Sequence, residues 1–187
     1  MMTRFSTWIL ATAALLLSAA CAGTPAPGAP RTASERDYLR SRDMMVPVHG
    51  VHPKDLRDTY TAPRSGGRAH LALDVMARRG TPVLAADEGI VRRVSSNNLG
   101  GRTVYIVDRS NRFVHYYAHL DRWAPGLREG QRVRRGDYIG TVGTTGNAPR
   151  NAPHLHYQLL RYVNSRMWWT GDPVNPIPYL RKKGKRR

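Results

Sequence analysis

The sequence predicts a mainly β protein with one folded domain, from about residue 46 to residue 180. Short runs rich in Val, Ile, Tyr and Leu alternate with turns that contain Gly, Pro or Asn, which is the usual pattern of consecutive strands. No segment repeats apolar residues at helical spacing over three turns. The 187 residues, of which 41% are hydrophobic, suffice for one core of ordinary size, and we expect no second domain and no internal repeat.

The first twenty residues predict an export signal. Arg4 is their only charged residue, and the apolar run over residues 8–20 ends in small side chains and is too short for a membrane helix. The single cysteine, Cys21, follows directly. This stretch resembles the lipobox of bacterial lipoproteins, which implies lipidation of Cys21. Ser18 stands where that motif usually has Leu, so an ordinary cleaved signal remains the alternative.

The segments that flank the domain differ from it in composition. Residues 21–45 are expected to form a flexible tether, because the stretch 22–34 is rich in Ala, Pro, Gly and Thr. Residues 35–45 are expected to form a short helix or to remain a loop. Residues 181–187, six of them basic, are expected to form a disordered tail.

The net charge is strongly positive, at +17, with 30 Lys and Arg against 13 Asp and Glu. Such a charge suits nucleic acid, and it also suits anionic lipid headgroups and cell-wall polymers. The export signal favours the second class, and the sequence has no recognised nucleic-acid motif. We therefore expect no nucleic-acid partner and no membrane contact except through a lipid on Cys21. The sequence does not indicate an oligomeric state.

Seven strands are expected within the domain, and the stretches 97–101 and 108–111 are expected to be turns between strands. The expected strands span residues 70–75, 82–85, 89–94, 103–108, 113–118, 138–142 and 154–160.

Four of the seven histidines lie in three short segments. On a strand, His70 and Asp74 would share a face because they are four residues apart. His154 and His156 would also share a face, with the leucine between them in the core. His119 follows a β run and is expected to precede a turn.

Two imidazoles and one carboxylate are ligands that zinc prefers. A catalytic zinc site has three protein ligands and leaves its fourth position to water. This ligand set keeps a net charge of about +1 with the ion, which preserves its Lewis acidity. Further histidines nearby can transfer protons and stabilise an oxyanion. Each segment alone is also typical of ordinary core or surface residues, but the three together predict a metal-dependent hydrolase.

These segments resemble the M23 peptidases, also called lysostaphin-like or LytM-type metallopeptidases. The resemblance covers residues 70–160, with a weaker likeness at 57–60. It is carried by the stretches 70–75, 80–86, 117–120, 136–146 and 153–157.

The resemblance implies an antiparallel sheet with a groove across it, and one zinc ion per chain held by His70, Asp74 and His156. It implies that His119 and His154 are the catalytic histidines, which orient or deprotonate the attacking water and stabilise the tetrahedral intermediate. It also implies cleavage of peptide bonds in the stem peptides or cross-links of peptidoglycan. A D-Ala to diaminopimelate cross-link and a glycine bridge both remain open.

Two positions depart from the family pattern. Ala72 stands where the family usually has Gly, which strains the backbone only if φ is positive there. Gln158 stands where the family often has an acid. Neither is an expected ligand. The alternative function is a non-catalytic wall-binding module that activates another hydrolase, but all five expected site positions hold the expected residue type, which favours an active enzyme.

The remaining histidines and a tryptophan pair are assigned to structure. His49 and His52 are expected to be exposed loop residues, and His115 is expected to face away from His119. Trp168 and Trp169 are expected to belong to the core or to a lid, with a sugar-binding groove as the alternative.

Overall fold

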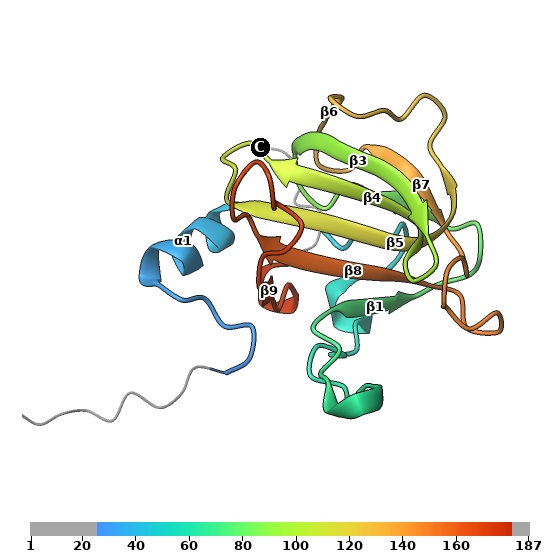
Figure 1. Cartoon of the computed structure of the whole chain (residues 1–187), viewed down its shortest axis with the longest axis horizontal. Coiled ribbons are helices and arrows are strands. Elements are labelled where there is room, and N and C mark those ends of the chain that lie inside the picture. Colours follow the sequence, from blue (N-terminus) through green and yellow to red (C-terminus); the bar gives the residue numbers. More distant parts are fainter. Residues whose placement is uncertain (1–25, 181–187) are drawn as a thin grey trace, which may run out of the picture.

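The computed structural model describes residues 26–180 (Figure 1). This part contains one antiparallel sheet of nine strands, one α-helix and three short 3-10 helices, so the mainly β antiparallel prediction is confirmed. The export signal, Cys21 and the basic tail lie outside the described residues. None of the helices within residues 26–180 is both long enough and apolar enough to cross a membrane. The elements are α1 (Ala33–Ser41), η1 (Pro53–Asp55), η2 (Ser65–Gly67), β1 (Leu73–Met76), β2 (Pro82–Leu84), β3 (Gly89–Asn97), β4 (Gly101–Asp108), β5 (Phe113–Trp123), β6 (Arg132–Val133), β7 (Tyr138–Val142), β8 (His154–Arg161), β9 (Pro173–Val174) and η3 (Ile177–Tyr179).

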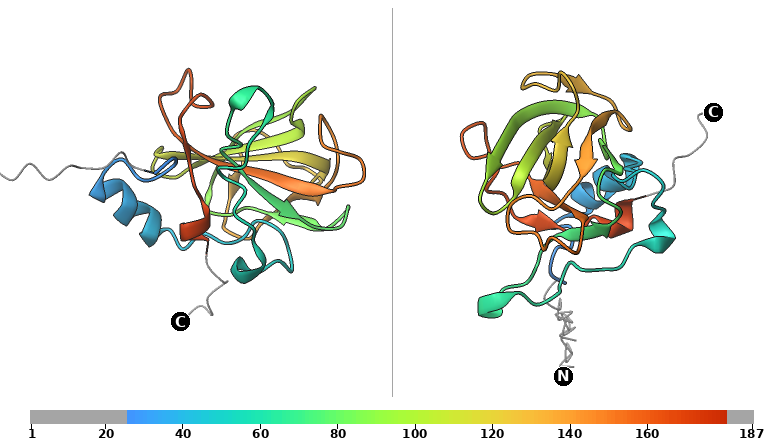
Figure 2. Two further views of the ribbon diagram at one scale, coloured as in Figure 1. Left: turned by 90° about the horizontal axis from the view of Figure 1, so that it is seen from below. Right: turned by 90° about the vertical axis from the view of Figure 1, so that its right-hand side faces the viewer.

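The sheet has the order β1-β8-β5-β4-β3-β6, with β7 beside β5, β2 beside β7 and β9 beside β8. The central strand β5 pairs with β8 as far as Ala118, and from Leu120 onward it pairs with β7 instead. The sheet as a whole is strongly curved (Figure 2). His119 is the one residue between the two pairings.

Alternation along the strands gives the sheet two different faces. One face carries the main hydrophobic core, in which Leu73, Val75, Leu155 and Tyr157 are at most 2% exposed. The residues between them, including Asp74, therefore point to the other face. The second face carries a smaller apolar cluster of Val107, Val114, Leu160 and Trp168, as well as polar side chains such as Asp74.

The first expected strand begins later than the sequence predicts. β1 starts at Leu73, because Leu71 has a φ of 55° and the chain is not extended there. The prediction that His70 and Asp74 share a strand face is therefore wrong. Ala72 does not have a positive φ, so the substitution of the usual Gly by Ala does not strain the backbone there. The residue with a positive φ is its neighbour Leu71.

The other strands agree with the sequence-based expectation apart from their ends. β5 continues five residues beyond the predicted end at 118 and includes His119, so the expectation of a turn after His119 is wrong. β3 and β4 meet at the expected turn near residues 97–101. The two-residue strands β6 and β9 were not expected, since they are too short to show a period.

Helix α1 overlaps the stretch 35–45, for which a short helix or a loop was expected, and it lies within the range 21–45 expected to be a flexible tether. Thr32 caps it by accepting a hydrogen bond from the backbone N–H of Glu35 at 3.0 Å. The Glu35 carboxylate pairs with Arg161 of β8 at 2.7 Å, and Leu39 is buried in the main core. The tether prediction is therefore corrected from Ala33 onward, because an apolar contact and a largely buried ion pair hold this segment on the sheet.

Candidate metal centre and catalytic histidines

The register of the sheet brings Asp74 and His156 together. Asp74 of β1 lies directly opposite His156 of β8, which lies opposite Ala118 of β5. Directly opposite residues point to the same face. The Asp74 Oδ1 atom is 3.0 Å from Nδ1 of His156. Strand pairing therefore brings together two of the three predicted metal ligands.

A loop, rather than a strand, positions His70. Its backbone N–H donates to the carbonyl of Ala62 at 2.9 Å, and that of Leu71 donates to the carbonyl of Tyr60 at 2.7 Å. The side chain of Gln158 in turn donates to the Leu71 carbonyl at 3.2 Å, so the residue that departs from the family pattern supports this turn. The resulting position of His70 places its Nε2 3.1 Å from Asp74 Oδ1.

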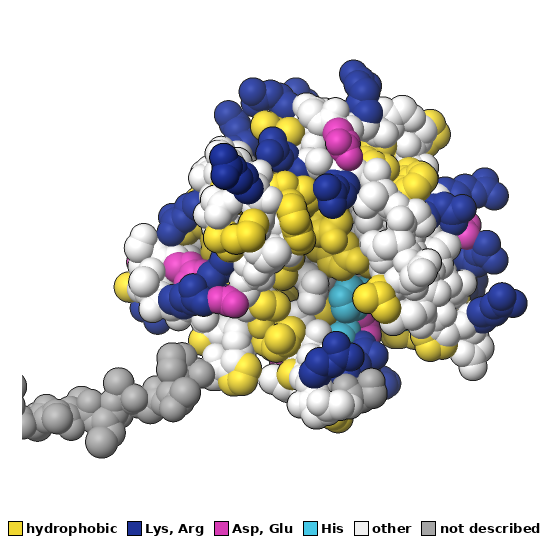
Figure 3. Space-filling model, viewed as in Figure 1, with side chains coloured by type: hydrophobic (Ala, Val, Ile, Leu, Met, Phe, Trp, Pro, Cys, Tyr) yellow, Lys and Arg dark blue, Asp and Glu magenta, His cyan; other side chains and the backbone are white. Residues whose placement is uncertain are grey.

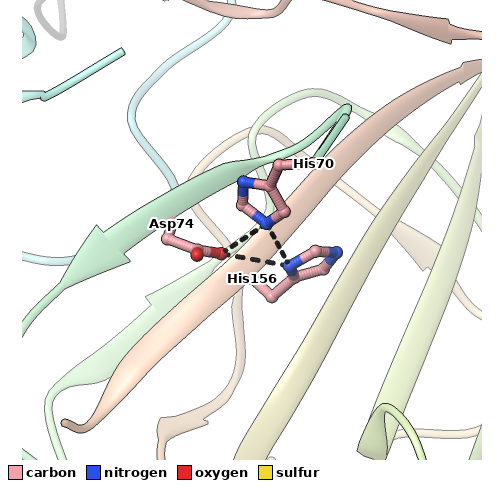
Figure 4. A group of neighbouring side chains, drawn as sticks. All are labelled: His70, Asp74 and His156. Carbon is pink, nitrogen blue, oxygen red and sulfur yellow. Dashed lines mark hydrogen bonds and ion pairs between the residues drawn. The ribbon is translucent and has the colours of Figure 1, made fainter. Parts of the chain in front are cut away.

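Three donor atoms thus form a nearly equilateral triangle (Figure 4). His70 Nε2 and His156 Nδ1 are 3.1 Å apart, and Asp74 Oδ1 lies 3.1 Å and 3.0 Å from them. Ligands of a tetrahedral zinc ion, each about 2.0–2.1 Å from it, are about 3.3 Å from one another. The triangle fits such an ion to within a few tenths of an ångström, and these residues form a group that could hold a metal.

Hydrogen bonds to Thr59 position two of these ligands for metal binding. The Nδ1–H of His70 donates to the carbonyl of Thr59 at 3.0 Å, which leaves Nε2 with its lone pair toward the centre. The Thr59 hydroxyl accepts from the backbone N–H of Asp74 at 2.9 Å. Thr59 therefore supports two of the three donors. Nothing in the sequence marks this threonine apart from the weak likeness at residues 57–60.

The charge state of the centre also suits a cation. Burial would raise the pKa of Asp74, but hydrogen bonds with His156 and His70 outweigh it and hold the pKa well below its usual range. Burial also lowers the pKa of His156. At neutral pH the centre thus presents a carboxylate and a neutral imidazole, which are the forms that bind metal.

His154 lies beside this triangle. It shares a face of β8 with His156, while Leu155 between them is fully buried in the core, as the alternation predicts. Its Nδ1–H donates to the carbonyl of Ala152 at 2.8 Å, and its Nε2 is 3.8 Å from Asp74 Oδ1.

A bulge brings His119 to the same place. Regular alternation would put His119 on the core face with Tyr117, but β5 has an extra residue there relative to β4, and His119 has a φ of 61°. Its ring centroid is consequently 5.0 Å from that of His154 and 5.6 Å from that of His156. The five predicted site residues therefore meet in one cluster.

The environment of His119 favours a neutral ring with a free Nε2. Its Nδ1–H donates to the carbonyl of Thr145 at 2.8 Å. Burial lowers the pKa of His119 to about 4, so the ring is neutral at physiological pH. Its second nitrogen is then available to accept a proton.

The surroundings of the cluster are open on one side and aromatic on another. Histidine side chains are visible in a depression of this face, next to hydrophobic side chains (Figure 3). Tyr116 packs edge-on against His156, with ring centroids 6.1 Å apart. The ring of Tyr116 also packs against that of Tyr105, with centroids 4.5 Å apart. A cavity of about 520 Å³ also reaches Asp74 from the side of β1. Its lining consists of Val51, Asp55, Leu56, Arg57, Thr59, Asp74, Val75 and Met76.

The other candidates lie outside the cluster. His49 and His52 are exposed, as expected. His115 is 1% exposed on the core face, where its Nδ1 is 2.8 Å from the hydroxyl of Tyr157. Trp168 is buried against Tyr105, in agreement with a structural role, whereas Trp169 is 41% exposed.

Comparisons with known proteins agree with this geometry. The sequence model of peptidase family M23 matches residues 68–176. The L-Ala–D-Glu endopeptidase of Bacillus subtilis is 38% identical over 121 residues, which is 62% of this chain and 36% of that protein. The peptidoglycan DD-endopeptidase ShyC of Vibrio cholerae is 42% identical over 93 residues, which is 50% of this chain and 20% of that protein. The chain thus spans about a third or less of the length of these two relatives.

Solved structures show the same fold. The catalytic domain of lysostaphin from Staphylococcus simulans superposes with a TM-score of 0.54 at 24% identity, covering 76% of this chain and 95% of that one. The catalytic domain of the prophage-encoded M23 protein EnpA from Enterococcus faecalis superposes with a TM-score of 0.50 at 31% identity, covering 60% of this chain and 82% of that one.

Proposed function

The chain belongs to peptidase family M23, and from this premise we propose that it is a zinc-dependent endopeptidase that hydrolyses peptide bonds in the stem peptides or cross-links of bacterial peptidoglycan. The observation that carries the proposal is the donor triangle of His70, Asp74 and His156, with edges of 3.0–3.1 Å. Two relatives named as peptidoglycan or L-Ala–D-Glu endopeptidases support the substrate class.

In the proposed mechanism the three donors hold one zinc ion. When bound there, zinc supplies a Lewis acid that polarises the scissile carbonyl and makes a water molecule more acidic. The carbonyl of Thr59 keeps the His70 ring in the tautomer that has a free Nε2. Asp74 contributes one carboxylate oxygen, Oδ1, and stays ionised because its pKa is held low.

His119 and His154 carry the proton transfers. Both rings have Nδ1–H bound to a backbone carbonyl, so Nε2 is the atom that can accept a proton from the attacking water. The resulting imidazolium can hydrogen-bond to the developing oxyanion through this Nε2–H, and it then transfers the proton to the nitrogen of the leaving amine. Because the two rings are adjacent, at 5.0 Å between centroids, one can receive the proton while the Nε2 of the other accepts a hydrogen bond from the same water molecule and orients it.

A non-catalytic module that activates another wall hydrolase is the alternative. It would not need the fixed tautomers of His119 and His154, since these matter only for proton transfer. The presence of both catalytic candidates beside a complete donor triangle favours the enzyme.

The test is digestion of purified peptidoglycan by the purified protein. We expect about one zinc ion per chain by elemental analysis, and the release of fragments with new amino ends. A chelator should stop the release and added zinc should restore it. The masses of the fragments identify the bond that is cleaved. Stimulation of a partner hydrolase without any new peptide ends would support the alternative and overturn the proposal.

We also propose that the protein acts in the cell envelope, exported by residues 1–20 and anchored by a lipid on Cys21. The support is the sequence of the signal, a relative named as a peptidoglycan endopeptidase, and a relative named as a lipoprotein NlpD/LppB homolog of Pseudomonas aeruginosa, which is 31% identical over 119 residues. Cys21→Ser should release the protein from the membrane fraction. Membrane association that survives this change would argue against the anchor.

A further inference from the structure

The two oxygens of Asp74 have different partners. Oδ1 faces His156 and His70, whereas Oδ2 accepts a hydrogen bond from Nη2 of Arg64 at 2.8 Å. We propose that Arg64 is a positioning residue that restricts Asp74 to one-oxygen ligation, so that the fourth position of the metal stays open for water. The inference rests on the proposed metal site and adds to it a residue that neither the motifs nor the family resemblance assigns.

One loop delivers both Arg64 and His70 to the centre. The loop folds back on itself, and its tip is η2, where two successive glycines have φ of 74° and 71°. It projects from the sheet beside β1 (Figure 1). Three backbone hydrogen bonds join its two sides, from Leu71 to Tyr60 at 2.7 Å, from His70 to Ala62 at 2.9 Å and from Arg64 to Arg68 at 2.8 Å. The backbone positions of Arg64 and His70 are therefore held relative to each other.

The chemistry of the carboxylate explains why the contact matters. A carboxylate can bind a cation through one oxygen or through both. If Oδ2 of Asp74 also reached the metal, it would crowd the position that a catalytic zinc site leaves to water, and the metal would be five-coordinate while that water stayed bound. A charge-assisted hydrogen bond from Arg64 competes for that oxygen and opposes the rotation that would bring it to the metal.

The contact is not explained by stability. The Arg64 side chain is 48% exposed, and exposed ion pairs contribute little to folding. Its consequence should therefore appear at the metal centre and not in the unfolding of the protein. The guanidinium also adds a positive charge beside the centre without taking a coordination position.

The chain offers a matched control. Arg79 binds Asp121 at 2.6 Å, with side-chain exposures of 66% and 15% that resemble the 48% and 16% of Arg64 and Asp74. Asp121 is not a member of the metal centre. A substitution of Arg79 thus removes a similar ion pair at a place where no ligand depends on it.

The experiment compares the full chain with Arg64→Met, Arg64→Lys and Arg79→Met after loading with cobalt(II) in place of zinc. Cobalt absorbs visible light more strongly when four-coordinate than when five-coordinate, so the spectrum reports whether a second Asp74 oxygen has bound. We expect Arg64→Met to lose visible absorption while keeping one cobalt per chain and its melting temperature. Arg64→Lys should recover part of the absorption, since an ammonium can still donate to Oδ2. Arg79→Met should match the wild type.

Turnover of the zinc-loaded proteins gives the second measurement. For Arg64→Met we expect kcat to fall by about 10- to 100-fold, as is usual when a partner of a metal ligand is removed, with a smaller change in KM. A cobalt spectrum of Arg64→Met identical to that of the wild type would overturn the inference and leave the proposed function standing. A wild-type protein that binds neither cobalt nor zinc would instead overturn the proposed function, and the role of Arg64 with it.

Discussion

The ring centroids of His119 and His156 are 5.6 Å apart, yet the nitrogen atoms of the two rings have different roles. His156 directs Nδ1 into the donor triangle, whereas His119 directs no atom into it and has a free Nε2. We therefore expect His119→Ala to retain zinc and to lose turnover by about 10²- to 10⁴-fold, the usual contribution of an acid–base group. His156→Ala should lose both. Zinc content after dialysis and the rate of wall cleavage measure the two effects. Wild-type turnover in His119→Ala would remove this residue from the mechanism.

His115 is a buried histidine that the proposed reaction does not use. Burial lowers its pKa in the folded state below the value of about 6.5 that holds in the unfolded chain. In the interval between these two pKa values the unfolded state binds more protons, so the free energy of unfolding decreases as the pH falls below about 6.5.

We expect His115→Gln to reduce this slope by up to one proton, or about 1.4 kcal/mol per pH unit. The measurement is denaturant unfolding between neutral pH and the onset of acid unfolding. It is made with chelator present so that metal binding adds no pH dependence of its own. A slope that does not change in the variant would show that His115 titrates alike in both states.

At the scale of elements, the contact between the β3–β4 turn and the loop after β7 controls the position of His119. The carbonyl that accepts from the His119 ring belongs to Thr145, and the Thr145 hydroxyl accepts from the backbone of Arg102 at 2.9 Å. Gly146 makes this approach possible, since a Cβ on it would lie 2.3 Å from the backbone nitrogen of Gly101. The turn between β3 and β4 and the loop after β7 thus approach each other closely, with the backbone of Gly101 against that of Gly146.

Gly146→Ala should consequently destabilise the protein and lower its turnover. Its φ of 72° costs an alanine about 1–2 kcal/mol, and the clash adds about 1–3 kcal/mol. Gly126→Ala is the control, because Gly126 has a φ of 73° but nothing within 4 Å of the added Cβ. Denaturant unfolding should separate the two variants, and only Gly146→Ala should reduce kcat. Equal effects of the two substitutions would mean that φ alone matters at Gly146.

These elements also show why part of the site was predictable from the sequence. Alternation along β1 and β8 placed Asp74, His154 and His156 on one face, because period-2 patterns are visible in the residue order. The positions of His70 and His119 depend instead on positive φ at Leu71 and at His119 itself. Leucine and histidine do not signal that conformation as glycine does, so pattern alone misplaced both. The resemblance to the family identified these residues as site members without explaining how they reach the site.

For the molecule as a whole, the sequence placed the start of the domain too late. The stretch before residue 46 contains few apolar residues, so it resembles a tether by composition. Yet Leu39 and Met44 are each 1% exposed and belong to the main core, and Tyr38 stacks on Phe113 with ring centroids 5.8 Å apart. Two or three apolar contacts from a polar segment leave no period to detect in the sequence, although they attach the segment to the sheet.

This packing predicts that the folded unit needs the segment before residue 46. Burial of a Leu or Met side chain contributes about 1.5–3 kcal/mol, so a chain that begins at Val46 should lose roughly 3–6 kcal/mol relative to one that begins at Ala26. That is a large part of the 5–15 kcal/mol typical of a domain. Within the longer chain, Leu39→Ala should cost about 2–5 kcal/mol, whereas Asp37→Ala, on the exposed side of α1, should cost little. Unfolding by denaturant, followed by circular dichroism, measures all four proteins. Equal stability of the two truncated chains would show that α1 adds nothing to the fold, and that the tether extends to residue 45 as the composition indicates.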